Sequence, residues 1–172
     1  VSVDGKILVS EALVLSAGVA GFDTSAIEYI SIVVDDPAAT TGTVSFVTTG
    51  LSFVPEITVN STAALTDLGN AGIGAMEPAG SNTVTSFTQN GVGSASFVYD
   101  LSNGTGNDRW AGSLLSFANV FDLSSQDLVI SVTDAGGSYY NLVLEDSTGK
   151  KVTLRVSVDG KILVSEALVL SA

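Results

Sequence analysis

The chain contains neither cysteine nor histidine among its 172 residues. The absence of cysteine excludes disulfide bonds and thiol nucleophiles, and the absence of both residues excludes Cys/His zinc sites and histidine-based triads. Any catalysis would have to rest on carboxylate, serine, threonine or tyrosine side chains. We find no nucleophile elbow, phosphate-binding loop or motif of paired carboxylates. We therefore expect that the protein is not an enzyme.

Basic residues are also scarce, since six Lys and Arg stand against eighteen Asp and Glu, a net charge of −12. This charge repels nucleic acids and anionic membrane surfaces, so we expect no nucleic-acid partner. No apolar run approaches the roughly 20 residues of a membrane helix, which predicts a soluble chain without membrane insertion. An acidic, Thr/Ser/Gly-rich composition favours an extracellular or cell-surface location, although composition alone leaves the cytoplasm open.

The most informative stretch occurs twice, because residues 1–17 and 156–172 share the sequence VSVDGKILVSEALVLSA. We interpret residues 1–172 as a single β-sandwich unit with a body at 18–155, in which one copy completes a neighbouring unit. The alternative is that the boundaries of the sequence cross a tandem repeat and leave the extra copy as an overhang. Both interpretations imply a repetitive or polymeric parent whose partners are copies of itself.

Each copy carries an Asp-Gly pair between apolar runs, which predicts a β-hairpin. In the second copy, Lys151–Val158 would be the first arm of that hairpin. The apolar residues could add a strand to a neighbouring sheet and build an open, head-to-tail fibre. The residues expected in these assembly strands are Ile7, Val9, Leu13 and Leu15 in the first copy and Ile162, Val164, Leu168 and Leu170 in the second.

Short segments with a period of two, separated by Gly, Asp and Asn turns, predict an all-β, antiparallel β-sandwich. The predicted strands are Ile27–Val34, Thr43–Val47, Thr83–Thr88, Gly93–Tyr99, Trp110–Phe117, Asp127–Val132 and Tyr139–Glu145. We expect the first two to be neighbours in a meander. The Ala/Gly/Ser-rich stretch from Asn60 to Asn82 has no clear period and is predicted to be a long connection.

Part of this pattern resembles the galactose-binding-like jelly rolls found in many carbohydrate-binding modules. The resemblance rests on Ser96–Asp100, Trp110–Gly112, Phe117, Phe121–Ser124, Leu128–Val132, Leu142–Asp146 and Gly149. The parts that should follow are found only by wrapping the sequence, as Val1–Ser16, Phe22–Ser25, Ile27–Val34 and Thr43–Val47. The resemblance implies a jelly roll in circularly shifted order. Its motifs are core and turn positions, so it says more about fold than about function.

Two aromatic residues are candidates for ligand binding, because modules of this family often bind sugars on exposed aromatic side chains. Tyr139 is out of phase with Tyr140, which is expected to face the core, and Trp110 lies beside the most polar loop. The alternatives are an ordinary exposed aromatic for Tyr139 and a core anchor at the start of a strand for Trp110.

The polar loop from Asp100 to Asp108 is a candidate calcium site. Oxygen-rich, irregular loops suit the coordination shell of Ca²⁺. The proposed ligands are Asp100, Asn103, Asn107 and Asp108. The alternative is a solvated turn whose Asp and Asn side chains cap their own backbone. We expect no required cofactor, with Ca²⁺ as the one candidate.

The sequence therefore favours a non-catalytic structural module of an extracellular filament, adhesin stalk or surface array, joined to its neighbours through the duplicated donor strand. The alternative function is that of a carbohydrate-binding module of a secreted protein, with a glycan as its partner.

Overall fold

The computed structural model describes residues 21–52, 72–122, 126–134, 136–137, 139–157 and 160–163. The strands within these ranges are β1 Ile27–Val34, β2 Thr41–Ser52, β3 Gly72–Met76, β4 Val84–Gly91, β5 Ser94–Asp100, β6 Ala111–Phe121, β7 Gln126–Asp134, β8 Tyr139–Asp146, β9 Lys151–Ser157 and β10 Gly160–Leu163. Two 3-10 turns, η1 Leu101–Asn103 and η2 Gly106–Asp108, lie between β5 and β6. Among the described residues, no helix is long and apolar enough to span a bilayer.

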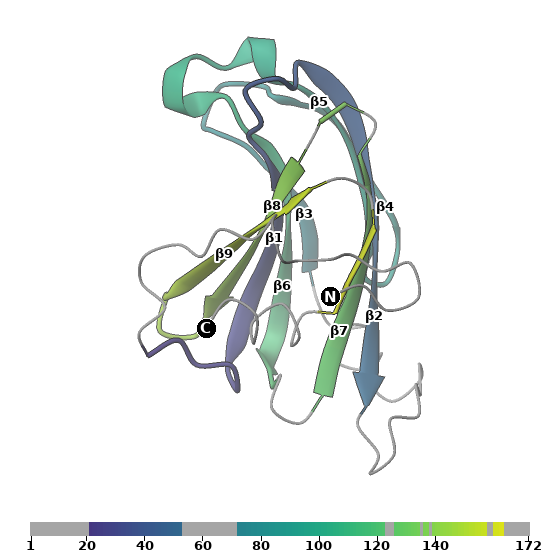
Figure 1. The fold of residues 1–172 in the computed structure, drawn as a ribbon, viewed down its shortest axis with the longest axis vertical. Helices are drawn as coiled ribbons and strands as arrows, with labels where there is room; N and C mark the ends of the chain where they lie inside the picture. The colour runs from purple at the N-terminus through teal and green to yellow at the C-terminus, as the bar shows by residue number, and fades with distance from the viewer. Residues whose placement is uncertain are drawn as a thin grey trace.

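The described strands form two antiparallel sheets that pack face to face (Figure 1), which confirms the predicted all-β sandwich. Sheet A has the strand order β3-β6-β1-β8-β9, and sheet B has the order β10-β7-β2-β5-β4. The η1 and η2 turns lie beyond one end of the sandwich, at the top of Figure 1.

One hydrophobic core fills the space between the sheets. In β1 and β5 alternate residues face this core, as the period of two requires. In β1 these are Ile30, Ile32 and Val34, and in β5 they are Phe97 and Tyr99, all at most 3% exposed. Burying one such side chain is worth about 1.5–3 kcal/mol. The sandwich is therefore held by the alternation visible in the sequence.

The predicted meander of the first two strands is wrong. β1 lies in sheet A between β6 and β8, whereas β2 lies in sheet B between β5 and β7. The short connection between them crosses from one sheet to the other and is fixed at both ends. The Asp36 carboxylate accepts the Ala38 N–H at 2.8 Å, and the Leu101 N–H donates to the Thr40 carbonyl at 2.8 Å.

The predicted hairpin in the second copy is also wrong, because β9 and β10 belong to different sheets. β9 pairs with β8 at the edge of sheet A, and β10 pairs with β7 at the edge of sheet B. The inward side chains of β9, Val152 and Leu154, are fully buried. An Asp-Gly pair predicts a change of direction, but it does not decide which sheet the next strand joins.

The described part of the predicted long connection, from residue 72 on, includes a strand that sequence periodicity missed. β3 consists of Gly72, Ile73, Gly74, Ala75 and Met76, and it pairs with β6 at the edge of sheet A. The Ser113 hydroxyl adds a hydrogen bond to the Gly74 carbonyl at 3.1 Å. Glycine and alanine carry almost no alternating pattern, so backbone pairing with β6 defines this strand.

Candidate functional site

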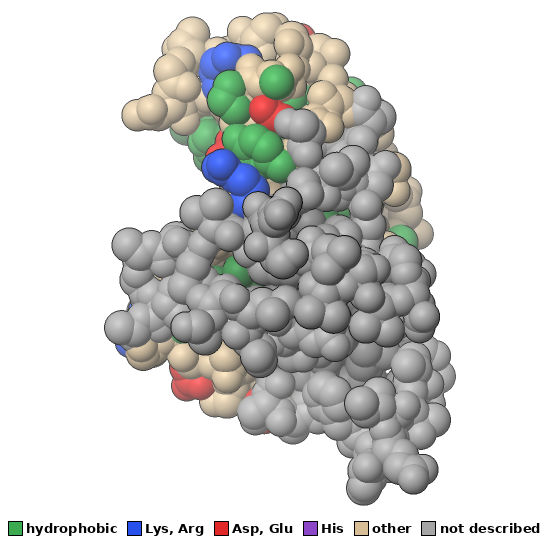
Figure 2. All heavy atoms as spheres, viewed as in Figure 1, with side chains coloured by type: hydrophobic (Ala, Val, Ile, Leu, Met, Phe, Trp, Pro, Cys, Tyr) green, Lys and Arg blue, Asp and Glu red, His purple; other side chains and the backbone are tan. Residues whose placement is uncertain are grey.

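A groove of about 860 Å³ lies over the outer face of sheet A. Its lining comes from the residues that alternate with the core, among them Tyr29 and Val33 on β1 and Asn141 and Val143 on β8. Figure 2 shows basic and hydrophobic side chains beside a hollow on the left of the view. The volume is within the range of about 300–1,000 Å³ that is typical of small-molecule sites.

The loop between β5 and β6 borders one end of the groove through Gly106, Asn107, Arg109 and Trp110. The guanidinium of Arg109 holds this loop, since its Nε donates to the Leu101 carbonyl at 3.3 Å. The Thr83 hydroxyl, fully buried, donates to the Trp110 carbonyl at 2.6 Å. The hydrogen bond from Thr83 therefore holds the backbone of Trp110 in place.

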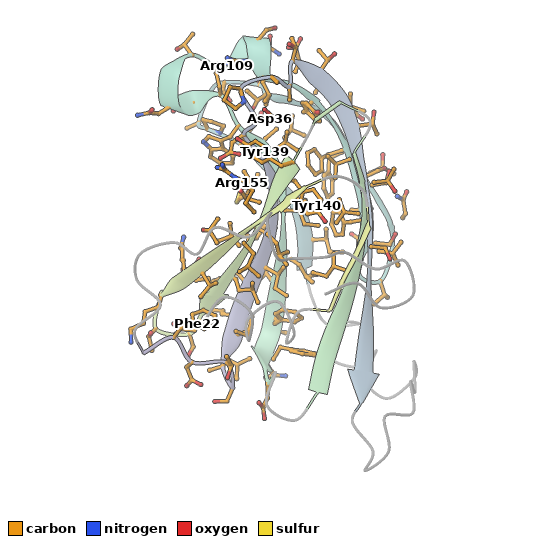
Figure 3. All side chains as sticks on the ribbon, viewed as in Figure 1. Phe22, Asp36, Arg109, Tyr139, Tyr140 and Arg155 are labelled. Atoms are coloured by element: carbon orange, nitrogen blue, oxygen red, sulfur yellow. The ribbon has the colours of Figure 1, made fainter. Side chains whose placement is uncertain are left out.

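The structure brings the two aromatic candidates to the same side of the sandwich. Trp110 is half-buried and lines the groove, so it is not a fully buried core anchor. Tyr139 stacks on Arg155, whose guanidinium carbon lies 4.2 Å from the ring centroid. In Figure 3, Tyr139 and Arg155 point away from the interior of the sandwich, whereas Tyr140 points into it and is fully buried. Ligand binding by Tyr139 and Trp110 stays a prediction.

Three polar side chains that the sequence did not single out gather beside them. Val33 has Asn141 as its Cα partner on β8, and Asn141 has Arg155 as its partner on β9, while Asp35 follows β1 on the same face. The Oδ1 atoms of Asp35 and Asn141 and the Nε of Arg155 are buried and make no hydrogen bond. Such atoms are uncommon because buried polar groups are normally paired.

Burial also raises the pKa of Asp35 above its usual value, and the neighbouring Asp36 adds to this effect. The cation of Arg155 and a hydrogen bond with Asn141 oppose the rise without cancelling it. Burial likewise raises the pKa of Tyr139, with the charge of Asp35 contributing. Both shifts arise mainly because burial disfavours the charged form of an acid.

The charges that line the groove balance one another. Glu145 forms an ion pair with Lys151 at 3.0 Å, and the other charged lining residues are Asp35 and Arg109. Two carboxylates thus face two cations in a chain whose net charge is −12. The groove is therefore less acidic than the molecule as a whole.

The candidate calcium ligands do not form one cluster of carboxylates. The Oδ1 of Asp100 accepts the N–H of Ser102 at 2.9 Å and its hydroxyl at 2.6 Å, which is the turn-capping alternative. Asn103 donates to the Asn82 carbonyl at 2.9 Å. Asn107 and Asp108 are exposed. Within the described part of the chain, no group of three or more Asp and Glu residues could hold a metal ion. Calcium binding stays a prediction.

The second candidate element is the edge of sheet B beside β7, which we call the β7 edge. β10 occupies it in antiparallel register, with Lys161 opposite Ser131 and Ile162 opposite Ile130. Ile162 is thus the one predicted assembly residue within the described ranges. The others, namely Ile7, Val9, Leu13, Leu15, Val164, Leu168 and Leu170, lie outside the described residues.

The groove and the β7 edge lie on different sheets, so a ligand and a donor strand would not compete for the same surface. The chain matches no protein-family model, no curated protein and no solved structure.

Proposed function

We propose that the protein is a non-catalytic structural module that joins to other copies of itself by β-strand addition. One observation carries this proposal: Gly160–Leu163 pairs with the β7 edge, and residues 5–8 have the same sequence. A backbone ladder depends on the sequence and register of the added strand. Residues 5–8 of a second copy therefore suit the same edge in the same register.

The contact between units would be head-to-tail. The proposed donor, residues 5–8, and the acceptor, the β7 edge, are different segments of the chain, so the two copies would not contribute the same patch to the contact. Contacts of this kind generate open chains or rings rather than closed two-fold dimers. Because β10 occupies the β7 edge within its own chain at a higher effective concentration, a second copy adds only by displacing β10, which high protein concentration favours.

The proposed setting is an extracellular filament, adhesin stalk or surface array. The net charge of −12 makes copies repel one another except where backbone pairing brings them together. The proposal includes the jelly-roll fold in circularly shifted order. The position of β10 supports the circularly shifted order, because sheet B receives its last described strand from the second copy.

Light scattering at increasing protein concentration tests this function. The full chain should form oligomers that grow with concentration, while a chain lacking residues 1–17 should stay monomeric because it keeps β10 and has no spare donor. A chain in which residues 1–17 are scrambled is the matched control for composition and should also stay monomeric. If all three chains are monomers over the same range, strand addition between copies is wrong.

A further inference from the structure

The end of β4 carries an asparagine whose surroundings favour a covalent change of its side chain. We propose that Asn90 is a site of spontaneous deamidation, which converts it to a mixture of aspartate and isoaspartate. The proposal does not depend on strand addition at the β7 edge, because β4 and β10 form opposite edges of sheet B.

The reaction needs only the chain itself and water. The backbone nitrogen of Gly91 attacks the side-chain Cγ of Asn90 and forms a new C–N bond. The bond from Cγ to the amide nitrogen breaks, and that nitrogen leaves as ammonia with the proton of the backbone N–H. Water then opens the resulting five-membered imide at one of its two carbonyls, which gives aspartate or isoaspartate. Glycine favours the attack because it has no side chain to shield its nitrogen.

The fold leaves this attack at Asn90 unhindered. The register of β4 against β5 shifts between Gln89 and Gly91, so Asn90 is an extra residue without a Cα partner on β5. Asn90 and Gly91 are both exposed, and a Cβ added to Gly91 would meet no atom within 4 Å. The Asn90 amide donates to the Ser96 hydroxyl at 3.3 Å, which is a long and solvent-exposed hydrogen bond. The side chain is therefore weakly restrained and can turn towards the Gly91 nitrogen.

The second Asn-Gly pair of the chain, Asn103 and Gly104, is held against the same reaction. The Gly104 N–H, which would have to give up its proton, donates to the Leu101 carbonyl at 3.2 Å at the end of η1. The Asn103 amide donates to the Asn82 carbonyl at 2.9 Å, so it is already engaged. Gly104 is also buried, and a side chain there would collide with the Asp108 carbonyl. The same dipeptide thus has two environments, and only the one at Asn90 permits the attack.

The product differs from the starting chain in charge more than in fold. Deamidation adds one negative charge to a net charge of −12. Isoaspartate also adds one carbon to the backbone, but Asn90 is where the pairing of β4 with β5 is already interrupted. The modified chain should therefore stay folded and be more acidic by one unit.

Peptide mapping of the aged full chain tests the proposal. The chain is kept in mildly alkaline buffer, both folded and unfolded in urea, and then cleaved with chymotrypsin. Cleavage after Phe97 and Tyr99 separates the two Asn-Gly pairs, and mass spectrometry detects the replacement of NH2 by OH in each. In the folded chain Asn90 should react about tenfold faster than Asn103, because the hydrogen bonds at Asn103 must break first. The two rates should be similar in urea. Equal rates in the folded chain, or a faster reaction at Asn103, would overturn the proposal.

Variants assign the change in charge to one residue. On anion exchange, the ageing chain should develop a later peak that elutes with Asn90→Asp. Asn90→Gln is the matched control, since it keeps an amide whose ring closure is less favourable, and it should not develop that peak. Asn103→Gln should age like the unmodified chain. A later peak that persists undiminished in Asn90→Gln would show that the charge arises elsewhere.

Discussion

The carboxylate of Asp146 accepts the backbone N–H of Asp23 at 2.9 Å, across 123 positions of the sequence. The same carboxylate is fully buried and also accepts the N–H groups of Thr148 at 2.9 Å and Lys150 at 3.0 Å and the Thr148 hydroxyl at 2.7 Å. It thereby ties the segment before β1 to the turn between β8 and β9. Lys150 adds a hydrogen bond to the Gly21 carbonyl at 2.7 Å.

These contacts predict a pH-dependent contribution to stability. Burial alone would raise the pKa of Asp146, but the hydrogen bonds from Thr148, Asp23 and Lys150 outweigh it and lower the pKa from 3.8 to about 2. A lowered pKa means that the stabilisation is complete above about pH 4 and is lost as the pH falls towards 2. Asp146→Asn should therefore reduce the free energy of unfolding more at pH 6 than at pH 2.

Urea unfolding at both pH values measures this difference. Asp108→Asn serves as the control, since Asp108 is exposed on the loop between β5 and β6. An Asp146→Asn variant that loses as much stability at pH 2 as at pH 6 would show that the ionised carboxylate does not hold the two segments together.

The hydroxyl of Thr83 should position Trp110. Thr83 is fully buried and donates to the Trp110 carbonyl at 2.6 Å, so Thr83→Val leaves that carbonyl without this donor. We expect a loss of about 1–3 kcal/mol in the free energy of unfolding, together with a red shift of Trp110 emission as the ring becomes more exposed. Thr85→Val is the control, because its hydrogen bond to the Val98 carbonyl is exposed. Comparable losses for both variants would contradict a special role for Thr83.

The loop between β5 and β6 should be stable without calcium. Asp100 already caps the backbone of Ser102, so the turn forms from protein contacts alone. The melting temperature should be the same in EDTA and in millimolar Ca²⁺. A rise of several degrees with Ca²⁺ that disappears in Asp108→Asn would instead support the calcium site predicted from the sequence.

The strands were predictable from sequence where burial alternates. The predicted segment Ile27–Val34 coincides with β1, and the opposite faces of Tyr139 and Tyr140 follow from the same period of two. The pairing of strands was not predictable in this way. Whether β2 joins the sheet of β1, or β10 the sheet of β9, depends on long-range contacts that no local turn signal contains.

The groove was harder to predict than the strands. Trp110 was a candidate because it follows the polar loop. Asp35 comes directly after β1, Asn141 lies on β8 and Arg155 on β9, and the three meet only through the register of sheet A. The sequence signal that could have found Asn141 was the alternation along β8. Asn141 lies between Tyr140 and Leu142, which face the core, so its own side chain belongs to the outer face of the strand. The burial of Asn141 on that outer face could not be inferred from the alternation.

Strand addition between copies is tested most directly by disulfide trapping, which the absence of cysteine makes free of background. Ser131 is opposite Lys161 across the β7 edge, and Lys6 is the counterpart of Lys161 in the first copy. Ser131→Cys with Lys161→Cys should form a disulfide within one chain. Ser131→Cys with Lys6→Cys should form disulfides between chains and give a ladder of oligomers on a non-reducing gel. If the Lys6→Cys pair gives only monomers while the Lys161→Cys pair oxidises fully, residues 1–17 do not add to a neighbouring copy.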